Sequence, residues 1–407
     1  MFHDDALKHL RRGVHVIQRS CFGLAYCFEW DAKTNRAIPL RNGSKYRSFQ
    51  ILCYLFVFFV APAFLARSYH LAVMSPPGQE SPASIGVTYA AAIIITGFVP
   101  MAWNLKRASG PRKYVSVYQA TMEMEKHFEA LCRNYDLNPA ALTAVQTCSK
   151  MLSSYFYQFD YMAPLSFAII SFTPISPVYT TIHSISKALN LKLITGKIGT
   201  ILISGVPASL GGIFLMATMG ACILISGYGV VCLYVWTLAI IPTSNRVELP
   251  FETALHVYTC LRHVTILHSE MAHDFVAVCL HHGTMVVLST GALFNMITEL
   301  AKGAEMSAIL IFACVALILV CLWIEIFAIY FTAMSSTASK EFFRQMRLIH
   351  GENKYKRKAL RCLLPNYVNL EAVSSADTFL NGVQMEYFSN YLIRVTDNTI
   401  DLLLAYK

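Results

Sequence analysis

The sequence predicts an all-α integral membrane protein, built as a bundle of seven transmembrane helices with cytosolic helical extensions. Hydrophobic residues make up 55% of the 407 residues and charged residues only 14%, whereas about a quarter of the residues in a soluble domain are charged. Six apolar stretches are each long enough to cross a bilayer, which takes roughly 20 residues. These stretches are 48–65, 86–103, 155–177, 213–241, 276–297 and 307–332.

The lysines and arginines between these stretches predict which way round the chain sits, because positively charged loops tend to stay in the cytosol. With a cytosolic N-terminus, alternate connecting segments place 26 basic residues inside and 5 outside. We therefore expect a multi-pass protein of the plasma membrane, with an extracellular C-terminus if a seventh helix crosses. The formal net charge of +9 fits loops that face anionic lipid better than a nucleic-acid partner.

Residues 1–47 are expected to form a cytosolic N-terminal segment. They lack the apolar core and small-residue cleavage site of a secretory signal peptide, so the first membrane helix is expected to lead insertion. Residues 6–18 have the pattern of an amphipathic helix, and a polar connection runs from Trp30 to Asn42.

Residues 48–333 hold the first six predicted membrane helices, and one region has two interpretations. Residues 199–241 stay apolar for over forty positions and could form two spans. Two spans would reverse the orientation of everything downstream and place the strongly basic segment 334–373 outside, against the charge rule. We therefore predict one long helix, with a non-spanning lead-in around Gly205 and Pro207.

Helical extensions are predicted on the cytosolic side, in the loops 105–150 and 242–275. In three windows apolar residues recur with helical spacing on one side, and polar residues occupy the other side. The windows are 107–150, 251–274 and 336–349. We expect these helices to pack together below the membrane, with residues 334–373 as a basic anchor. Helices lying on the lipid surface are the alternative.

The final segment, 374–407, is the least apolar candidate span. Polar residues interrupt it, and inside a membrane such residues usually face a bundle interior or a water-filled path. They are Asn390, Arg394, Asp397, Asn398 and Asp401. We therefore predict a seventh helix that is enclosed by protein or water.

The spacing within this helix predicts a pore lining. Thr399, Leu403 and Tyr406 share one face, whereas Asp397 and Asp401 share another. In a symmetric assembly, one copy of the helix from each subunit would line a central pore. Leu403 would then form a constriction that excludes water, and rings of aspartate would favour cations. The alternative is that the aspartates pair with nearby arginine or lysine side chains.

Motifs for an enzyme, a cofactor or a metal site are missing from the sequence. There is no phosphate-binding GxxxxGK[ST] motif, so an ATP-driven pump is not expected. No C-x-x-C pair occurs, and the histidines do not follow the HExxH spacing of a zinc site. We predict no enzymatic activity, no cofactor and no metal.

Two ionisable residues, Asp160 and Glu325, lie within predicted spans. Ionisable residues inside a membrane are costly and are functional candidates by default. Glu325 either makes an interhelical hydrogen bond or takes part in gating or proton relay. His281 and His282 of the fifth span are its candidate partners.

The outer halves of the spans carry aromatic and methionine residues with few polar groups. A concave site lined in this way suits a small organic ligand. The candidate ligand-binding residues are Tyr89, Phe167, Phe172, Phe214, Met219 and Phe312. The alternative for each of them is an ordinary lipid-facing or core residue.

Two local sequences resemble those of the arthropod gustatory and odorant receptor superfamily. Residues 7–13 read LKHLRRG and residues 21–24 read CFGL, which is similar to the lead-in of gustatory members. Residues 399–406, TIDLLLAY, are similar to the last-helix signature TYhhhhhQ, in which h is apolar. Thr399 matches the threonine and residues 402–405 match the apolar run, whereas Ile400 replaces the signature tyrosine, Asp401 interrupts the run and Tyr406 replaces the glutamine.

The resemblance implies a chemosensory receptor: a homo- or hetero-tetrameric, ligand-gated, non-selective cation channel that a small organic molecule opens. It implies a ligand pocket in the outer half, formed by helices two to six. The cytosolic extensions of helices four to six would form a central anchor with helix seven. It also implies a gate at Leu403, with Thr399 and Tyr406 on the pore-facing side, and leaves Asp397 and Asp401 as charge at the outer mouth.

Two other classes of protein remain as alternatives. A G-protein-coupled receptor needs the opposite orientation, and the chain lacks an Asn-Pro-x-x-Tyr run and an outer disulfide pair. A secondary transporter would use Asp160 and Glu325, and would show substrate flux without tetramerisation.

Overall fold

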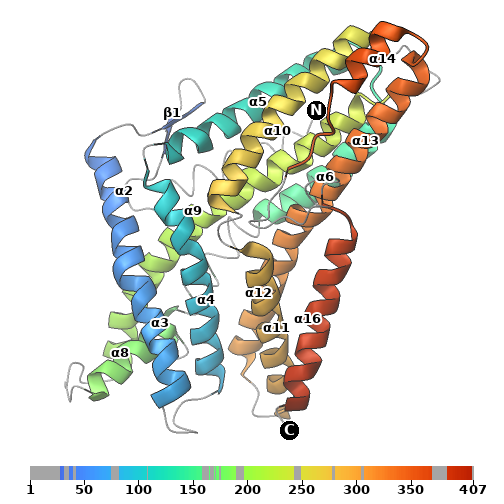
Figure 1. Ribbon diagram of the computed structural model, residues 1–407. Helices are drawn as coiled ribbons and strands as arrows, with labels where there is room; N and C mark the ends of the chain where they lie inside the picture. The colour runs from blue at the N-terminus through green and yellow to red at the C-terminus, as the bar shows by residue number, and fades with distance from the viewer. Residues whose placement is uncertain are drawn as a thin grey trace.

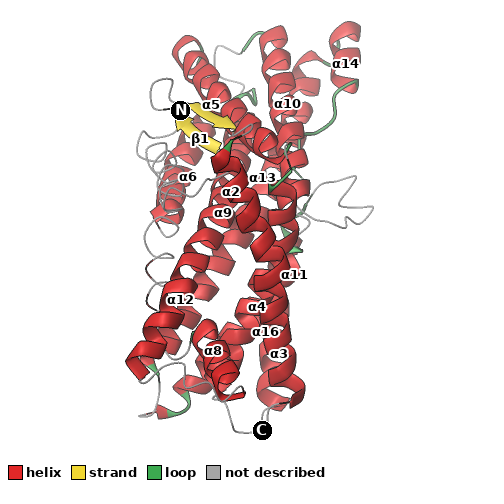
Figure 2. Cartoon of the chain, turned by 90° about the vertical axis from the view of Figure 1, so that its left-hand side faces the viewer, coloured by secondary structure: helices red, strands yellow, loops and turns green. Residues whose placement is uncertain are grey.

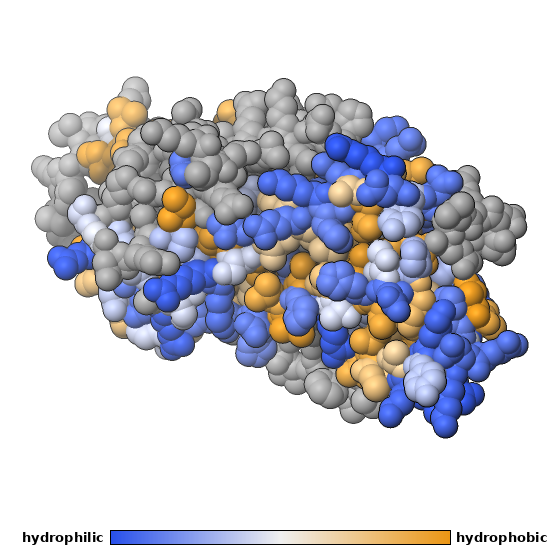
Figure 3. Space-filling model, turned by 90° about the horizontal axis from the view of Figure 1, so that it is seen from above, coloured by the Kyte–Doolittle hydropathy of each residue, from blue (hydrophilic) through white to orange (hydrophobic). Residues whose placement is uncertain are grey.

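The computed structural model is an elongated bundle of helices with one small β-hairpin (Figures 1 and 2). One half, lower in Figure 1, holds the apolar helices. The other half holds amphipathic helices, and hydrophilic side chains cover much of its described end surface (Figure 3). The structure describes residues 28–31, 36–39, 43–74, 82–107, 109–157, 171–173, 176–188, 197–242, 249–276, 280–303, 307–368 and 383–405, together with Leu165 and Ile169.

The first span is one continuous helix whose hydrogen-bond pattern alternates between α and π. It consists of α2 (Ser44–Leu55), η1 (Phe56–Val60), α3 (Ala61–Tyr69) and η2 (His70–Met74). Phe56 on this helix packs edge-on against Phe98 of the next span, with ring centroids 4.9 Å apart.

The first span is longer than predicted, and this corrects the position of Arg67. The apolar helix runs from Tyr46 to Met74, so Arg67 lies within it rather than in an outer loop. Its side chain is buried, with Nη1 3.3 Å from Nδ1 of His70. The arginine lowers the local hydropathy but does not end the helix, because protein rather than lipid surrounds it.

Four helices among the described residues are long and apolar enough to cross a membrane, and they correspond to predicted spans one, two, five and six. They are Tyr46–Met74, Ser84–Leu105, His281–Leu300 and Ala308–His350. The elements that carry the last three are α4 (Pro82–Leu105), α11 (His281–Leu300), α12 (Ala308–Glu325), η6 (Ile326–Tyr330) and α13 (Phe331–His350). Most of predicted span three lies outside the described residues, between α6 (Pro139–Tyr157) and α8 (Pro177–Ala188).

The long apolar region is a single helix, α9 (Lys197–Ala239), of 43 residues. The prediction of one long helix is confirmed. Gly205 and Pro207 lie inside α9, and the prediction that this first part does not span the membrane stays a prediction. At Gly205 an added Cβ would lie 2.4 Å from Cδ1 of Phe172. The glycine therefore allows a close contact with the neighbouring segment, which offsets its weak helix preference.

The amphipathic half is built from α5 (Gly110–Asn134), α10 (Phe251–Phe275), α14 (Lys354–Arg361) and the adjoining ends of α9 and α13 (Figure 1). The predicted helical windows 251–274 and 336–349 fall within α10 and α13. The remaining window, 107–150, is predicted as one helical run but consists of two helices, α5 and α6, with Asn138 directly before α6. The Asn138 side chain accepts a hydrogen bond from the Ala140 N–H at 2.9 Å and so caps α6.

The largest hydrophobic core joins α5, α6, α9, α10 and α13 in this half and continues into the first two spans, where it includes Phe56 and Phe98. Trp236 of α9 is fully buried and stacks on Phe128 of α5, with ring centroids 5.4 Å apart. Its Nε1 donates a 2.8 Å hydrogen bond to the buried carboxylate of Glu125. The apolar faces therefore pack against one another, as expected for helices that continue beyond the membrane; which side of the membrane they occupy stays a prediction.

A short antiparallel hairpin, β1 (Phe28–Asp31) and β2 (Arg36–Pro39), lies beside α5. The sequence predicts a polar connection without strands in this region. The strands are only four residues long, too short for a clear alternation of apolar and polar residues. The predicted amphipathic helix at 6–18 lies outside the described residues.

Candidate pore helix and its contacts

The predicted seventh helix is present as α16 (Glu386–Ala405), which lies alongside α11 in the apolar half (Figure 1). It is not among the four apolar spans of the described residues, in agreement with its interrupted sequence. Phe388 and Val395 pack against a buried cluster that includes Tyr391 of α16 and Met285 of α11. This packing defines the inner face of α16.

The inner face continues along the helix at intervals of four residues, as residues on one side of a helix must. Tyr391 and Thr399 are 2% and 3% exposed, and Leu403 is partly buried. The Thr399 hydroxyl donates to its own helix, at the carbonyl oxygen of Val395, over 2.6 Å. Because this bond satisfies the hydroxyl, Thr399 can be buried against its own chain.

The outer face of α16 carries the charges. Arg394, Asp397 and Asp401 are exposed, and so are the apolar residues Ile393 and Ile400. In the single chain the aspartate face is therefore available to other subunits or to water. Thr399, which the resemblance puts on the pore-facing side, is turned inward. Tyr406 lies outside the described residues, and the assignment of pore residues stays a prediction.

A chain of polar contacts joins α16 to α11 and α11 to α12. The hydroxyls of Tyr391 and Ser289 are 2.7 Å apart. The Tyr391 ring lies 6.0 Å from the His282 ring, centroid to centroid. Nδ1 of His282 is 3.1 Å from Oε2 of Glu325, whose side chain is fully buried. The sequence analysis named His282 as a candidate partner of Glu325, and this contact is present.

The backbone on both sides of this contact departs from regular α-helix. Leu280, directly before α11, has φ 47° and ψ 44°, a left-handed conformation that is uncommon for residues other than glycine. On the partner helix, Glu325 is the last residue of α12, and the π-helical turn η6 follows directly. Such turns frequently occur at functional sites. The Glu325–His282 contact thus lies where two helices change their geometry.

Ser289 and Tyr391 were not among the residues predicted from the sequence. Both residues are ordinary in an apolar helix, and each becomes informative only when the other is known to face it. The other predicted intramembrane acid, Asp160, lies outside the described residues.

The predicted ligand-binding residues occupy different elements. Tyr89 is partly buried on α4, Phe312 is 42% exposed on α12, and Phe172 is 41% exposed beside α9. Phe214 and Met219 belong to α9, but their side chains lie outside the described residues, as does Phe167. Ligand binding by these six residues stays a prediction.

In the described part of the chain, no group of three or more His, Cys, Asp or Glu side chains could hold a metal ion. The side chains of the polar chain from Glu325 to Ser289 can donate or accept hydrogen bonds.

The comparison with known proteins rests on three-dimensional structure. No family model and no curated protein sequence matches the chain. Its structure is similar to that of the insect olfactory receptor OR5 from Machilis hrabei in complex with eugenol, with a TM-score of 0.62 and 10% sequence identity. The match covers 98% of this chain and 98% of that chain. From end to end, the chain has the fold of an insect olfactory receptor.

Proposed function

We propose that this protein is a chemosensory receptor of the insect gustatory and odorant receptor superfamily. In this proposal it acts as a ligand-gated, non-selective cation channel in the plasma membrane. The observation that carries the proposal is the structural match to an olfactory receptor over 98% of both chains. The solved receptor holds eugenol, a small organic molecule, which supports a ligand of the same chemical class here.

The pore is proposed to form from one copy of α16 per subunit in a homo- or hetero-tetramer. The exposed face with Asp397 and Asp401 supports this role, because an exposed carboxylate within a membrane needs water or another subunit as its neighbour. Leu403 is the proposed constriction because the resemblance of residues 399–406 to the last-helix signature implies a gate there; in the single chain it is partly buried.

The ligand is proposed to bind in the outer half of the bundle, near Tyr89, Phe172 and Phe312. From there a shift of α11 or α12 reaches the pore helix through two contacts: Glu325 to His282, and Ser289 to Tyr391. The Ser289–Tyr391 contact is buried, as is the Glu325 carboxylate, and unpaired polar groups in apolar surroundings are costly. The helices therefore move together or exchange these partners as a unit.

The proposal is tested by expressing the full chain in non-excitable cells and recording whole-cell current during application of a broad panel of small organic molecules. We expect a ligand-dependent current that reverses near 0 mV in mixed cation solutions. Substitution of Leu403 by a small polar residue should raise the current that flows without ligand. A chain that reaches the cell surface, assembles as a tetramer and stays silent to the panel would contradict the proposal.

A further inference from the structure

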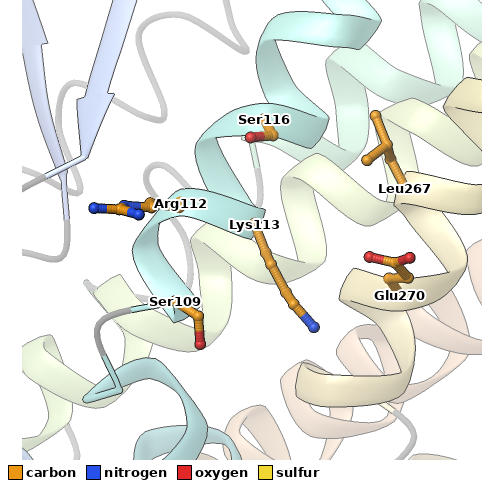
Figure 4. Close-up of a pocket in the computed structure, with 6 residues that line it drawn as sticks. All are labelled: Ser109, Arg112, Lys113, Ser116, Leu267 and Glu270. Atoms are coloured by element: carbon orange, nitrogen blue, oxygen red, sulfur yellow. The ribbon is translucent and has the colours of Figure 1, made fainter.

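A cleft opens between α5 and α10, at the end of α5 that follows the second span (Figure 4). Its volume is about 430 Å³, within the range of roughly 300–1,000 Å³ that is common for small-ligand pockets. The cleft is lined by Ser109, Arg112, Lys113 and Ser116 on the side of α5, and by Leu267 and Glu270 on α10.

The residues on the two sides of the cleft carry opposite charges. Lys113 reaches from α5 into the gap between the helices, and Glu270 faces it from α10, while Arg112 points outward from the flank of α5 (Figure 4). One Lys113 donor is used already, because Nζ lies 2.6 Å from Oδ2 of Asp274. Within the described part of the chain, no ion pair involves Glu270. The carboxylate is exposed and available to a cation from outside the chain.

The cleft lies at the level where a membrane span ends. The second span runs to Leu105, four residues before Ser109. Lys106 Nζ lies 3.2 Å from the ring centroid of Trp103 and 4.0 Å from that of Tyr54. Tryptophan and tyrosine rings concentrate at the boundary between lipid and water, and the buried Lys106 is held against one ring of each kind. The cleft therefore opens at head-group depth.

A ligand for this cleft must satisfy both signs of charge. A phosphate suits Lys113, whose ammonium group reaches into the cleft, and the serine hydroxyls can donate further hydrogen bonds to it. A simple phosphate or an anionic head group would leave Glu270 facing negative charge without compensation. An ammonium group close to the phosphate provides that compensation, and its N–H groups can donate to the carboxylate.

We propose that this cleft binds a phosphoethanolamine group, supplied by a phosphatidylethanolamine molecule of the adjacent leaflet. Phosphatidylcholine carries the same charges, but its quaternary nitrogen has no hydrogen to donate to Glu270. Phosphatidylglycerol lacks the cation altogether. The protein therefore selects phosphatidylethanolamine over both of these lipids, and Glu270 is the residue that selects it.

Native mass spectrometry of the full-length protein in detergent tests this selection, with the three lipids matched in acyl chains and added one at a time. We expect phosphatidylethanolamine to bind about tenfold more tightly than phosphatidylcholine, as one charge-assisted hydrogen bond provides. Glu270→Gln should abolish this difference. Glu352→Gln, which neutralises an exposed acid elsewhere, should keep it. Equal thermal unfolding of the two variants without lipid establishes that both are folded.

Two outcomes would overturn the proposal: equal binding of the three lipids by the unmodified protein, or a preference that survives in Glu270→Gln. A further arm adds soluble phosphoethanolamine as a competitor. Competition at the concentration at which the lipid binds would overturn the lipid as the source, because the acyl chains would then contribute nothing. None of these measurements depends on channel activity, so they remain decisive even if no current is found.

Discussion

Glu325 of α12 and His282 of α11 meet across a helix interface, with Oε2 and Nδ1 3.1 Å apart and the carboxylate shielded completely from solvent. A carboxylate in apolar surroundings needs such a partner, because removing one member of a buried pair leaves the other uncompensated. The pair therefore fixes the register of α11 against α12 at the point where η6 begins.

The first prediction concerns Glu325→Gln, which keeps a hydrogen-bond acceptor for His282 but removes the charge. We expect the protein to assemble normally, because the side-chain volume hardly changes. The loss of charge assistance weakens the contact by roughly 1 kcal/mol. Dose–response recordings should then show about a fivefold change in the half-maximal ligand concentration. Unchanged assembly together with an unchanged response would remove Glu325 from the gating path.

The second prediction concerns Tyr391→Phe, which removes the hydroxyl that faces Ser289 and leaves the ring in place. One buried hydrogen bond contributes about 1 kcal/mol, so the balance between closed and open states should shift about fivefold. Thr396→Val is the matched control, because Thr396 is exposed on the same helix and bonds only to the carbonyl of Leu392. Similar currents from both variants would show that the Ser289 contact does not hold the pore helix.

The third prediction separates the two faces of α16. Asp397→Asn with Asp401→Asn removes two exposed charges, each of which attracts a nearby cation by on the order of 1 kcal/mol in water. Single-channel conductance should fall several-fold at low ionic strength and much less at high ionic strength, where salt screens the charges. Asp136→Asn, at an exposed position outside α16, is the control. An unaltered conductance would mean that the aspartate face does not line the ion path.

The fourth prediction tests the contact between α9 and α10. A Cβ added at Gly229 would lie 1.6 Å from Nε2 of the buried His268, so Gly229→Ala forces the helices apart. We expect a loss of about 1–3 kcal/mol, as is usual for overpacking, seen as a lower midpoint in thermal unfolding of the purified protein. Gly211→Ala in the same helix meets no neighbour within 4 Å and should leave the midpoint unchanged or raise it slightly.

The fifth prediction is a pH dependence that arises at His268. Burial lowers the pKa of this histidine from 6.5 to about 4, against the opposite effect of the Ile225 and Ser226 carbonyls. Between these two values the unfolded chain binds a proton that the folded chain does not, so stability falls as the pH drops from 6.5 toward 4. The free energy of unfolding should fall by about 3 kcal/mol over this pH range.

The His268 effect can be measured by comparing thermal unfolding of the unmodified protein and His268→Leu at several pH values. In the variant, the part of the change in unfolding temperature with pH that comes from His268 should disappear. The contribution of the other histidines should stay. Glu341 acts in a lower range, because its bonds to Arg344 and Gln345 hold its pKa at about 2. Parallel curves for the two proteins between pH 6.5 and 4 would contradict the assignment to His268.

The apolar spans, the amphipathic extensions and the single long helix were predictable because each depends on composition or periodicity within one segment. The hydropathy of 199–241 and the charge of 334–373 together decided the number of helices there. The end of the first span was not predictable, since Arg67 lowers the hydropathy without ending the helix. The hairpin was missed because four-residue strands leave little pattern.

Part of the candidate site was predictable for a related reason. An acid within an apolar span stands out in the sequence, and two histidines in the preceding span suggested a partner for Glu325. The inward orientation of Thr399 and the meeting of Tyr391 with Ser289 depend on how α16 rotates against α11. That rotation is set by packing between segments about a hundred residues apart, which no local pattern records.

The length of α9 has a consequence for how the protein is made. At 43 residues it extends for roughly 65 Å, and its far end supplies Trp236 to the core of the amphipathic half. That core cannot close until the translocon has released this helix in the correct orientation. A failure of insertion therefore also leaves the extramembrane half unfolded. A wrongly inserted chain would therefore expose apolar surface both in the membrane half and in the extramembrane half. Cellular quality control could recognise it at either place.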